Sequence, residues 1–263
     1  GAGGYYASRA AVIGGFDATS NVRAGRDYDI PVSGTMAHSF IQSYDDELMA
    51  FRDFAEAWPD NCVLLADTSD TLERGIPNAI VVGLEMKQQG RHLKGIRLDS
   101  GDLADLSRKA RRILDDAGLQ DVKIAASNQL DEFLIKDLQD EKAPIDLFGV
   151  GTSLVTGQPD AALDGVYKLV FADSEPRIKL SETMEKTTLP HRKQVFRLHT
   201  NTELAGAEVV ALSDETEIAR MHHPFDPSKS LAIDAYEKEP LLHKMMENGR
   251  RVIPPQSVTE IAQ

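Results

Sequence analysis

One segment of the sequence, KGIRLDSGDL at residues 94–103, brings an arginine, two aspartates, a serine and a glycine together. The apolar run at 95–98 predicts a short strand, and a helical pattern begins directly after Asp102. Surface turns use Asp, Ser and Gly for backbone reasons alone. In α/β folds, however, the carboxyl ends of parallel strands also carry the binding groups. Arg97 beside Asp99 is therefore a candidate site for an anionic ligand.

Three more predicted strands end in polar or glycine-rich residues. These residues are Asp67 after CVLLA, Ser127 and Asn128 after VKIAA, and Gly149, Gly151 and Thr152 after IDLF. The carboxyl ends of barrel strands share one face, and that face carries active sites. Backbone N–H groups of the Gly-x-Gly-Thr segment could bind a phosphate, although an ordinary turn explains that segment equally well.

The segment that precedes these strands adds further polar candidates. Arg9 is expected at the start of a helix of small residues, and Asp17 follows a Gly-Gly turn. Thr35 and the pair His38-Ser39 follow the strand-like run IPVSG. A single histidine near an apolar strand is usually structural, but His38 could also be a nucleophile or an acid–base group. Together the residues indicate phosphoryl or phosphoribosyl chemistry without naming a reaction.

Strand and helix patterns alternate along residues 60–151 and must position these side chains. The strands are continuously apolar rather than alternating, which is typical of a parallel sheet that is open or closed into a barrel. Helical spacing places Trp58 on the apolar face of the helix before the first strand. The helix that begins at Pro77 is expected to turn Val81 and Leu84 inward.

The pattern changes near residue 165. Short strand-like runs such as KQVFRL and AEVVAL, separated by turns, indicate an antiparallel module. We therefore expect an α/β barrel that carries the catalytic face at residues 1–165. A smaller β-rich module, incomplete in this chain, is expected at residues 166–263.

Composition favours a globular protein of the cytoplasm. The 263 residues are 41% hydrophobic and 27% charged, and the net charge of −13 argues against a nucleic-acid or anionic-membrane partner. No apolar run approaches the ~18 residues of a membrane span. Cys62 is the one cysteine and is expected to pack in the core. The chain begins at Gly1 and stops in a helix-like pattern, so we expect a piece of a longer protein.

Five ordered segments give the chain a resemblance to a known family. They are SRAAVIGGFDATSNVRAG, PVSGTMAHSF, GIRLDSGDL, ASNQLDE and GVGTSLVTGQPDAALDGVYKLV. In this order and spacing they resemble the nicotinate phosphoribosyltransferases. The later segment RIKLSETMEKTTLPHRKQVFRL is similar to the part of that family that follows the barrel. The likeness covers nearly the whole chain.

The resemblance implies a type II phosphoribosyltransferase, with an irregular α/β barrel and a sandwich-like domain. Enzymes of this family join nicotinate to phosphoribosyl pyrophosphate, giving nicotinate mononucleotide and pyrophosphate in NAD salvage. Many couple this reaction to ATP hydrolysis through a transiently phosphorylated histidine. The resemblance therefore implies Mg²⁺, with ATP and phosphoribosyl pyrophosphate as substrates, and a cytoplasmic homodimer whose subunits share the site.

The resemblance also implies roles for individual residues. His38 corresponds to the phosphorylated histidine, and Arg97 with Asp99 corresponds to the pair that reaches the pyridine substituent and the ribose. The other implied substrate-binding residues are Arg9, Asp17, Thr35, Ser39, Asp67, Ser127 and Asn128. Those implied for the 5′-phosphate are Gly149, Gly151 and Thr152. No resident metal site is expected, because the pair His222-His223 matches no closed zinc pattern.

Several alternatives stay open. A relative with the same barrel could use nicotinamide or quinolinate, although the basic block expected for two carboxylates is not found. A truncated barrel could bind a nucleotide without turnover. An aldolase-type barrel would need a Schiff-base lysine, and Lys94 and Lys123 lie at the starts of strands, which is the wrong end. The sequence also departs from the family at Ser69, where an aromatic residue is common, and in its shorter length.

Overall fold

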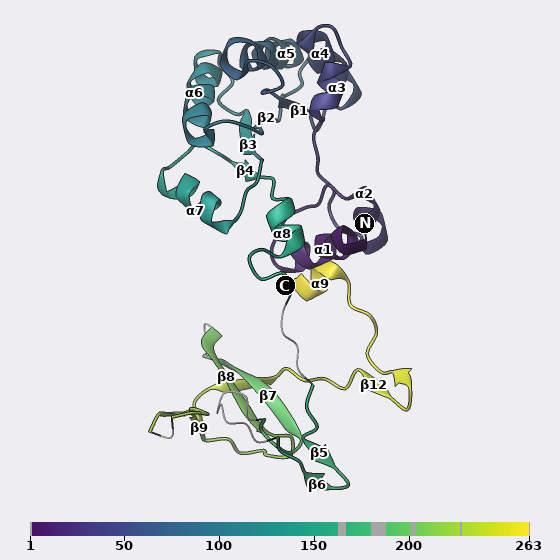
Figure 1. Ribbon diagram of the computed structural model, residues 1–263, viewed down its shortest axis with the longest axis vertical. Coiled ribbons are helices and arrows are strands. Elements are labelled where there is room, and N and C mark those ends of the chain that lie inside the picture. The colour runs from purple at the N-terminus through teal and green to yellow at the C-terminus, as the bar shows by residue number, and fades with distance from the viewer. Residues whose placement is uncertain (1, 163–166, 180–187, 201–203, 227, 263) are drawn as a thin grey trace. The chain divides into compact units, whose positions relative to one another are not determined.

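The computed structural model describes residues 2–162, 167–179, 188–200, 204–226 and 228–262 (Figure 1). The chain divides into two compact units. The first contains residues 1–163 and 256–263, and the second contains residues 164–255. The sequence pattern placed the last eight residues in the smaller module. They lie in the first unit because Val258 of helix α9 packs with the buried residues Ala24 and Ile30.

The first unit alternates helices with short strands. In chain order its elements are α1 Ala2–Ile13, α2 Val22–Tyr28, α3 His38–Gln42, α4 Glu47–Ala57, β1 Val63–Leu65, the π-helix η1 Thr71–Gly75, α5 Ile76–Gln88, β2 Gly95–Leu98, α6 Leu103–Asp116, β3 Lys123–Ala126, α7 Glu132–Asp140, β4 Leu147–Phe148, α8 Thr152–Thr156 and α9 Val258–Ala262.

The four strands of this unit form one parallel sheet in the order β1-β2-β3-β4. The register aligns Leu65 with Arg97, and Arg97 with Ala125. Helices α5 and α6 lie outside the strands (Figure 1), as expected for strands joined by helical crossovers. The parallel sheet with covering helices confirms the predicted α/β architecture.

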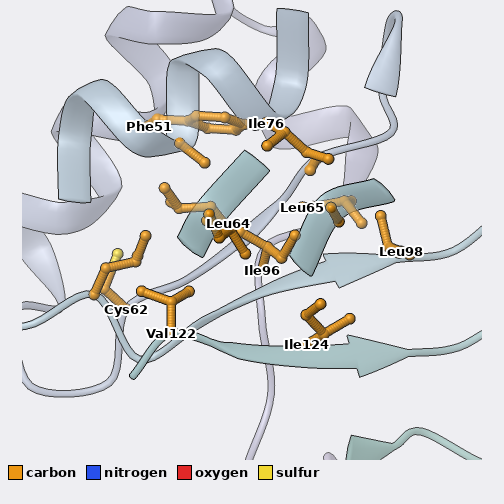
Figure 2. Packing of buried hydrophobic residues seen from close by; sticks show 14 of the residues in the cluster. Phe51, Cys62, Leu64, Leu65, Ile76, Ile96, Leu98, Val122 and Ile124 are labelled. Carbon is orange, nitrogen blue, oxygen red and sulfur yellow. The ribbon is translucent and has the colours of Figure 1, made fainter. Parts of the chain in front are cut away.

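The core of the unit is made by the inward faces of the strands and helices. Leu64, Ile96 and Ile124 occupy adjacent positions on three strands and are completely buried, with Phe51 of α4 and Ile76 of α5 packed nearby (Figure 2). Each such side chain contributes roughly 1.5–3 kcal/mol by leaving water. This packing fixes the strand ends that carry the polar residues.

Two details of the predicted packing are wrong. Trp58 lies just beyond the last helical residue of α4, where its backbone leaves the helix, and it is 61% exposed. Val81 and Leu84 lie on the outer face of α5, because the buried face runs through Ile76, Ala79, Val82 and Met86. Apolar residues occur all around this helix, so the sequence pattern alone does not identify the buried face.

The second unit is built from antiparallel strand pairs. Its strands are β5 Phe171–Ala172, β6 Glu175–Pro176, β7 Lys193–His199, β8 Leu204–Leu212, β9 Arg220–His222, β10 Ser230–Ala232, β11 Glu237–Pro240, β12 Met246–Glu247 and β13 Arg250–Arg251. The largest sheet has the order β11-β7-β8, and its core includes the fully buried Leu198 and Ile233. The β-rich character predicted after residue 165 is present.

Candidate active site

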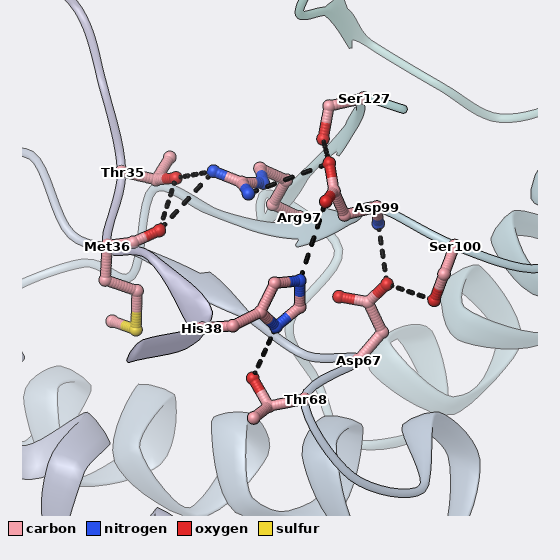
Figure 3. A network of polar contacts seen from close by, with 9 residues as sticks. All are labelled: Thr35, Met36, His38, Asp67, Thr68, Arg97, Asp99, Ser100 and Ser127. Atoms are coloured by element: carbon pink, nitrogen blue, oxygen red, sulfur yellow. Dashed lines mark hydrogen bonds and ion pairs between the residues drawn. The ribbon is translucent and has the colours of Figure 1, made fainter. Parts of the chain in front are cut away.

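A connected set of polar side chains lies where β1, β2 and β3 end (Figure 3). His38 is the first residue of α3 and is held through both ring nitrogens. Its Nδ1 lies 2.9 Å from the Thr68 hydroxyl oxygen, and its Nε2 lies 3.5 Å from Asp99 Oδ2. The His38 side chain is 37% exposed, so a ligand from solvent has access to the ring.

Arg97 and Asp99 form the centre of this set. The Arg97 side chain rises from β2 and donates hydrogen bonds to the Thr35 hydroxyl and, at 3.4 Å, to the Met36 carbonyl. Its other terminal nitrogen lies 3.7 Å from Asp99 Oδ1, which also accepts a hydrogen bond from the Ser127 hydroxyl. The guanidinium is thus held in one orientation by neutral acceptors and by one carboxylate.

Asp67 holds the turn that presents Asp99. It is 8% exposed, and its Oδ2 accepts hydrogen bonds from the Asp99 backbone N–H at 2.8 Å and from the Ser100 hydroxyl at 2.5 Å. Asp67 Oδ1 and Arg97 Nε are buried and have no hydrogen-bond partner among the described residues. Buried polar atoms without a partner are uncommon in folded proteins.

Local sequence explains why these side chains converge. Helix α6 begins where Asp102 accepts a hydrogen bond from the Asp105 backbone N–H, as predicted for a helix start, so β2 must end before it. Gly101 adopts φ of +77°, a conformation that favours glycine. Gly149, the residue after β4, lies next to Ser127: a Cβ added at Gly149 would be 3.5 Å from the Ser127 Cβ.

The structure links six of the predicted site residues by hydrogen bonds and ion pairs. Thr35, His38, Asp67, Arg97, Asp99 and Ser127 form the hydrogen-bonded set described above. Among the described contacts, the remaining candidates make no hydrogen bond to that set: Arg9, Asp17, Ser39, Asn128, Gly149, Gly151 and Thr152. The roles that the resemblance implies for all of these residues stay predictions.

The residues outside the set have their own surroundings. The Arg9 guanidinium lies over the Tyr28 ring, 5.9 Å from its centre. Asp17, Ser39 and Asn128 are exposed, and Asn128 has φ of +87°. Gly151 and Thr152 are exposed where α8 begins. Only a ligand that extends from His38 to these residues would contact both them and the hydrogen-bonded set.

Sequence reasoning gave no role to three contributors. Thr68 contacts the His38 ring, the Met36 carbonyl accepts from Arg97, and Glu47 binds the turn after β1. The position of Thr68 directly after Asp67 in a strand-end turn was a usable signal. The sequence contains no signal for the other two. The Met36 contact is made by the backbone carbonyl, which every residue has, and Glu47 lies on a helix that precedes the strand ends in the sequence.

No group of three or more His, Cys, Asp or Glu residues within the described ranges could hold a metal ion. The carboxylate of Asp67 is instead engaged by an N–H and a hydroxyl, and that of Asp99 by a hydroxyl, His38 and Arg97.

An imidazole, two carboxylates and a guanidinium at the carboxyl edge of a parallel sheet define a class of protein. Arginine binds carboxylate or phosphate, the imidazole can accept a phosphoryl group, and a carboxylate can take a proton or face a developing positive charge. The irregular α/β barrel fold is that of the type II phosphoribosyltransferases.

Comparison with known proteins identifies the family within this class. The sequence model of the nicotinate phosphoribosyltransferase C-terminal domain matches residues 192–263. A nicotinate phosphoribosyltransferase of Bacillus subtilis is 45% identical over 253 residues, which are 93% of this chain and 51% of that protein. Another from Mycobacterium tuberculosis is 47% identical over 247 residues, covering 93% of this chain and 48% of that protein.

Solved structures agree with the sequence relatives. Human nicotinic acid phosphoribosyltransferase superposes with a TM-score of 0.77 at 27% identity, over 97% of this chain and 59% of that chain. The nicotinate-nucleotide pyrophosphorylase of Pyrococcus furiosus superposes with a TM-score of 0.71 at 27% identity, over 97% of this chain and 58% of that one. The chain belongs to the nicotinate phosphoribosyltransferase family. It spans about half the length of the curated relatives that it matches.

Proposed function

We propose that this chain carries the site of a phosphoribosyltransferase that joins nicotinate to phosphoribosyl pyrophosphate, releasing nicotinate mononucleotide and pyrophosphate. The observation that carries this proposal is the linked set of His38, Asp99 and Arg97 at the carboxyl edge of the sheet. Relatives of the chain are named for this activity. The proposal would make the chain part of NAD salvage from nicotinate.

In this reaction the pyridine nitrogen attacks the anomeric carbon of the ribose while the bond to pyrophosphate breaks. The nitrogen is already a nucleophile, so holding the two substrates in line is the main task of the protein. Arg97, whose side chain is partly exposed at the end of β2, offers a cation for the nicotinate carboxylate. Asp99 supplies negative charge near the ribose, where positive charge develops.

We also propose that His38 takes a phosphoryl group from ATP. The Nε2 atom forms a bond to the γ-phosphorus, the bond from that phosphorus to the bridging oxygen breaks, and ADP leaves. The attacking Nε2 must carry the lone pair, so the ring proton is on Nδ1 and stays there while the N–P bond forms. The ring becomes positively charged, and Asp99 Oδ2, which lies 3.5 Å from Nε2, offsets that charge. Mg²⁺ bound to the substrate phosphates would neutralise their charge. The phosphohistidine would then place new negative charge beside the site and alter ligand affinity.

The assembly and location of the protein are proposals as well. We expect a homodimer whose subunits share the site, in the cytoplasm. No helix in the described ranges is long and apolar enough to cross a membrane. A size measurement by light scattering on the purified chain tests the dimer, and a monomer at all concentrations contradicts it.

The first experiment is the intact mass of the chain after incubation with Mg·ATP, compared with His38→Ala. We expect a gain of one acid-labile phosphoryl group that the variant does not show. A phosphoryl group that persists in the variant would place the chemistry elsewhere. Product analysis with phosphoribosyl pyrophosphate and, in turn, nicotinate, nicotinamide and quinolinate separates the proposed substrate from the alternatives. Ligand binding without any product would instead favour a non-catalytic barrel.

A further inference from the structure

Two carboxyl side chains are buried in the described part of the chain, and both lie at the turn of residues 66–69 that follows β1. Asp67 belongs to this turn and is already part of the candidate site. Glu47 is the first residue of α4 and is 7% exposed. The proposed reaction gives Glu47 no task, although the burial of a carboxylate is costly unless its bonds compensate for the loss of water.

Glu47 joins three elements through its two carboxylate oxygens. Oε1 accepts a hydrogen bond from the Ser69 hydroxyl at 3.1 Å, and Oε2 accepts one from the side-chain amide of Asn78, near the start of α5, at 2.9 Å. Both of these described partners are neutral. The free N–H groups at the start of α4 also favour a carboxylate at this position. The Ser69 hydroxyl is therefore tied to the first turns of two helices.

The turn connects Ser69 to the candidate site. Thr68 comes one residue earlier, and its hydroxyl oxygen lies 2.9 Å from His38 Nδ1. Asp67 comes two residues earlier and accepts the backbone N–H of Asp99 at 2.8 Å. Consecutive residues of one turn thus hold a ring and a backbone segment of the site (Figure 3), so a shift of the turn disturbs both.

We propose that Glu47 is a positioning residue of this site and acts through Ser69 on the turn of residues 66–69. This inference rests on the proposed function, because His38 and Asp99 act on substrates only there. Glu47 contacts neither of these two residues and no reacting atom. Its effect is geometric, because its hydrogen bonds fix where the turn lies.

Two substitutions of Glu47 separate its bonding from its charge. Glu47→Gln loses the charge and keeps the bonds, because the amide oxygen can accept from Asn78 and the amide nitrogen can donate to the Ser69 hydroxyl oxygen. Glu47→Met keeps the length of the side chain and removes both oxygens. Ser69→Ala cuts the link to the turn and leaves Glu47 bonded to Asn78. The matched control is Glu56→Gln, the same change at an exposed position of α4.

Nuclear magnetic resonance of the folded chain offers two reporter signals that Glu47 does not contact. One is the ring of His38, which the spectrum of His38→Ala identifies among the seven histidines, and the other is the backbone N–H of Asp99. We expect Glu47→Met and Ser69→Ala to shift both signals. Glu47→Gln and the control Glu56→Gln should leave both signals close to their positions in the unaltered chain.

The double variant that combines Glu47→Met with Ser69→Ala tests the path of the effect. If Glu47 acts through Ser69, the double variant shifts the two signals no further than Glu47→Met alone, whereas independent effects would add. Additive shifts would overturn the proposal. So would unmoved signals in Ser69→Ala, or signals in Glu47→Gln displaced as far as those in Glu47→Met. If Glu47→Met does not fold, Ser69→Ala and Glu47→Gln decide the question.

Labelling of His38 with Mg·ATP separates this inference from the proposed function. At saturating Mg·ATP, Ser69→Ala should label His38 about tenfold more slowly than the unaltered chain, because a small misplacement of reacting groups lowers the rate steeply. A purely structural role would lower stability and leave the labelling rate of the folded chain unchanged, which would contradict the proposal. An unaltered chain that takes up no phosphoryl group contradicts the proposed ATP step, while the two reporter signals still test Glu47.

Discussion

The Asp67 carboxylate accepts the backbone N–H of Asp99 at 2.8 Å, so a side chain after β1 continues the bonding between β1 and β2 beyond the last paired residues. The bond crosses from one strand end to the next and sets the direction in which Asp99 leaves the sheet. The Ser100 hydroxyl donates to the same oxygen, so two consecutive residues of the turn share one acceptor.

Replacement of this carboxylate should loosen the turn. Asp67→Ala leaves a part-buried N–H and a hydroxyl without their acceptor, which costs about 1–3 kcal/mol. We expect the free energy of unfolding, measured with urea, to fall by that amount. Asp60→Asn removes an exposed carboxylate and serves as the control. An Asp67→Ala variant as stable as the control would mean that the turn does not need the Asp67 carboxylate for its stability.

Gly75 is required where η1 meets the end of β1. A Cβ at this position would lie 1.8 Å from the Ala66 carbonyl oxygen, far inside contact distance. Gly75→Ala should push η1 from the strand end and lower the free energy of unfolding by about 1–3 kcal/mol or more, the usual cost of overpacking. Thermal unfolding followed by circular dichroism measures the loss.

The matched control for that variant is Gly4→Ala in helix α1. A Cβ at Gly4 has nothing within 4 Å, so the same chemical change meets open space. Alanine favours a helix over glycine by roughly 0.5–1 kcal/mol, and this control should be neutral or stabilising. Equal destabilisation by the two substitutions would contradict the close approach of Gly75 to Ala66.

Asp146 makes the stability of the first unit depend on pH in the acid range. Burial alone would raise the pKa of this carboxyl, but the Lys123 ammonium at 2.8 Å and the Ile124 N–H at 2.9 Å outweigh it and hold the pKa below 3.8. A lowered pKa in the folded state stabilises the fold above the unfolded pKa. That contribution is lost as the pH falls through the folded value.

Asp146→Asn should therefore cost about 1 kcal/mol of unfolding free energy at neutral pH. The difference from the unaltered chain should shrink as the pH is lowered below 3.8, because protonation then removes from Asp146 the charge that the asparagine variant already lacks. Urea titrations at several pH values measure this trend. The exposed Asp121→Asn is the control, and a difference that stays constant down to low pH would contradict the assignment.

Lys193 organises the start of β7 in the second unit. Its ammonium donates to the carbonyls of Leu189, Pro190 and His191, at 2.5, 3.2 and 2.8 Å, and burial lowers its pKa. Lys193→Met keeps the length of the side chain and removes the donors, so we expect a loss of about 1–3 kcal/mol. Lys168→Met, at an exposed position, is the comparison. Thermal stability that is the same in both variants would mean that water replaces the ammonium at no cost.

Much of the site could be predicted because strand ends carry a pattern. Apolar runs predict where strands stop, and parallel strands bring their carboxyl ends together, so Asp67, Arg97, Asp99 and Ser127 were expected as neighbours. The helix start at Asp102 followed from its residue type and position. These features depend on a few adjacent residues and on a general rule about sheets.

The remainder depends on contacts between distant residues, which one sequence does not contain. The bond from Ser69 to Glu47 joins positions 22 apart, and that from Thr68 to His38 joins positions 30 apart. The inward face of α5 was mispredicted because Val81 and Val82 are adjacent and equally apolar. Only packing after the π-helix decides that Val82 is buried and Val81 is exposed.

Cys62 can report local opening of the sheet at the junction between β1 and β2. The thiol is completely buried before β1, and burial raises its pKa to about 12. Its backbone carbonyl accepts the N–H of Lys94, so it lies where the first two strands are joined. Because the sequence has one cysteine, a thiol reagent at neutral pH reacts only when this junction parts. The rate of Cys62 modification therefore measures how often the junction between β1 and β2 opens, and no label has to be introduced.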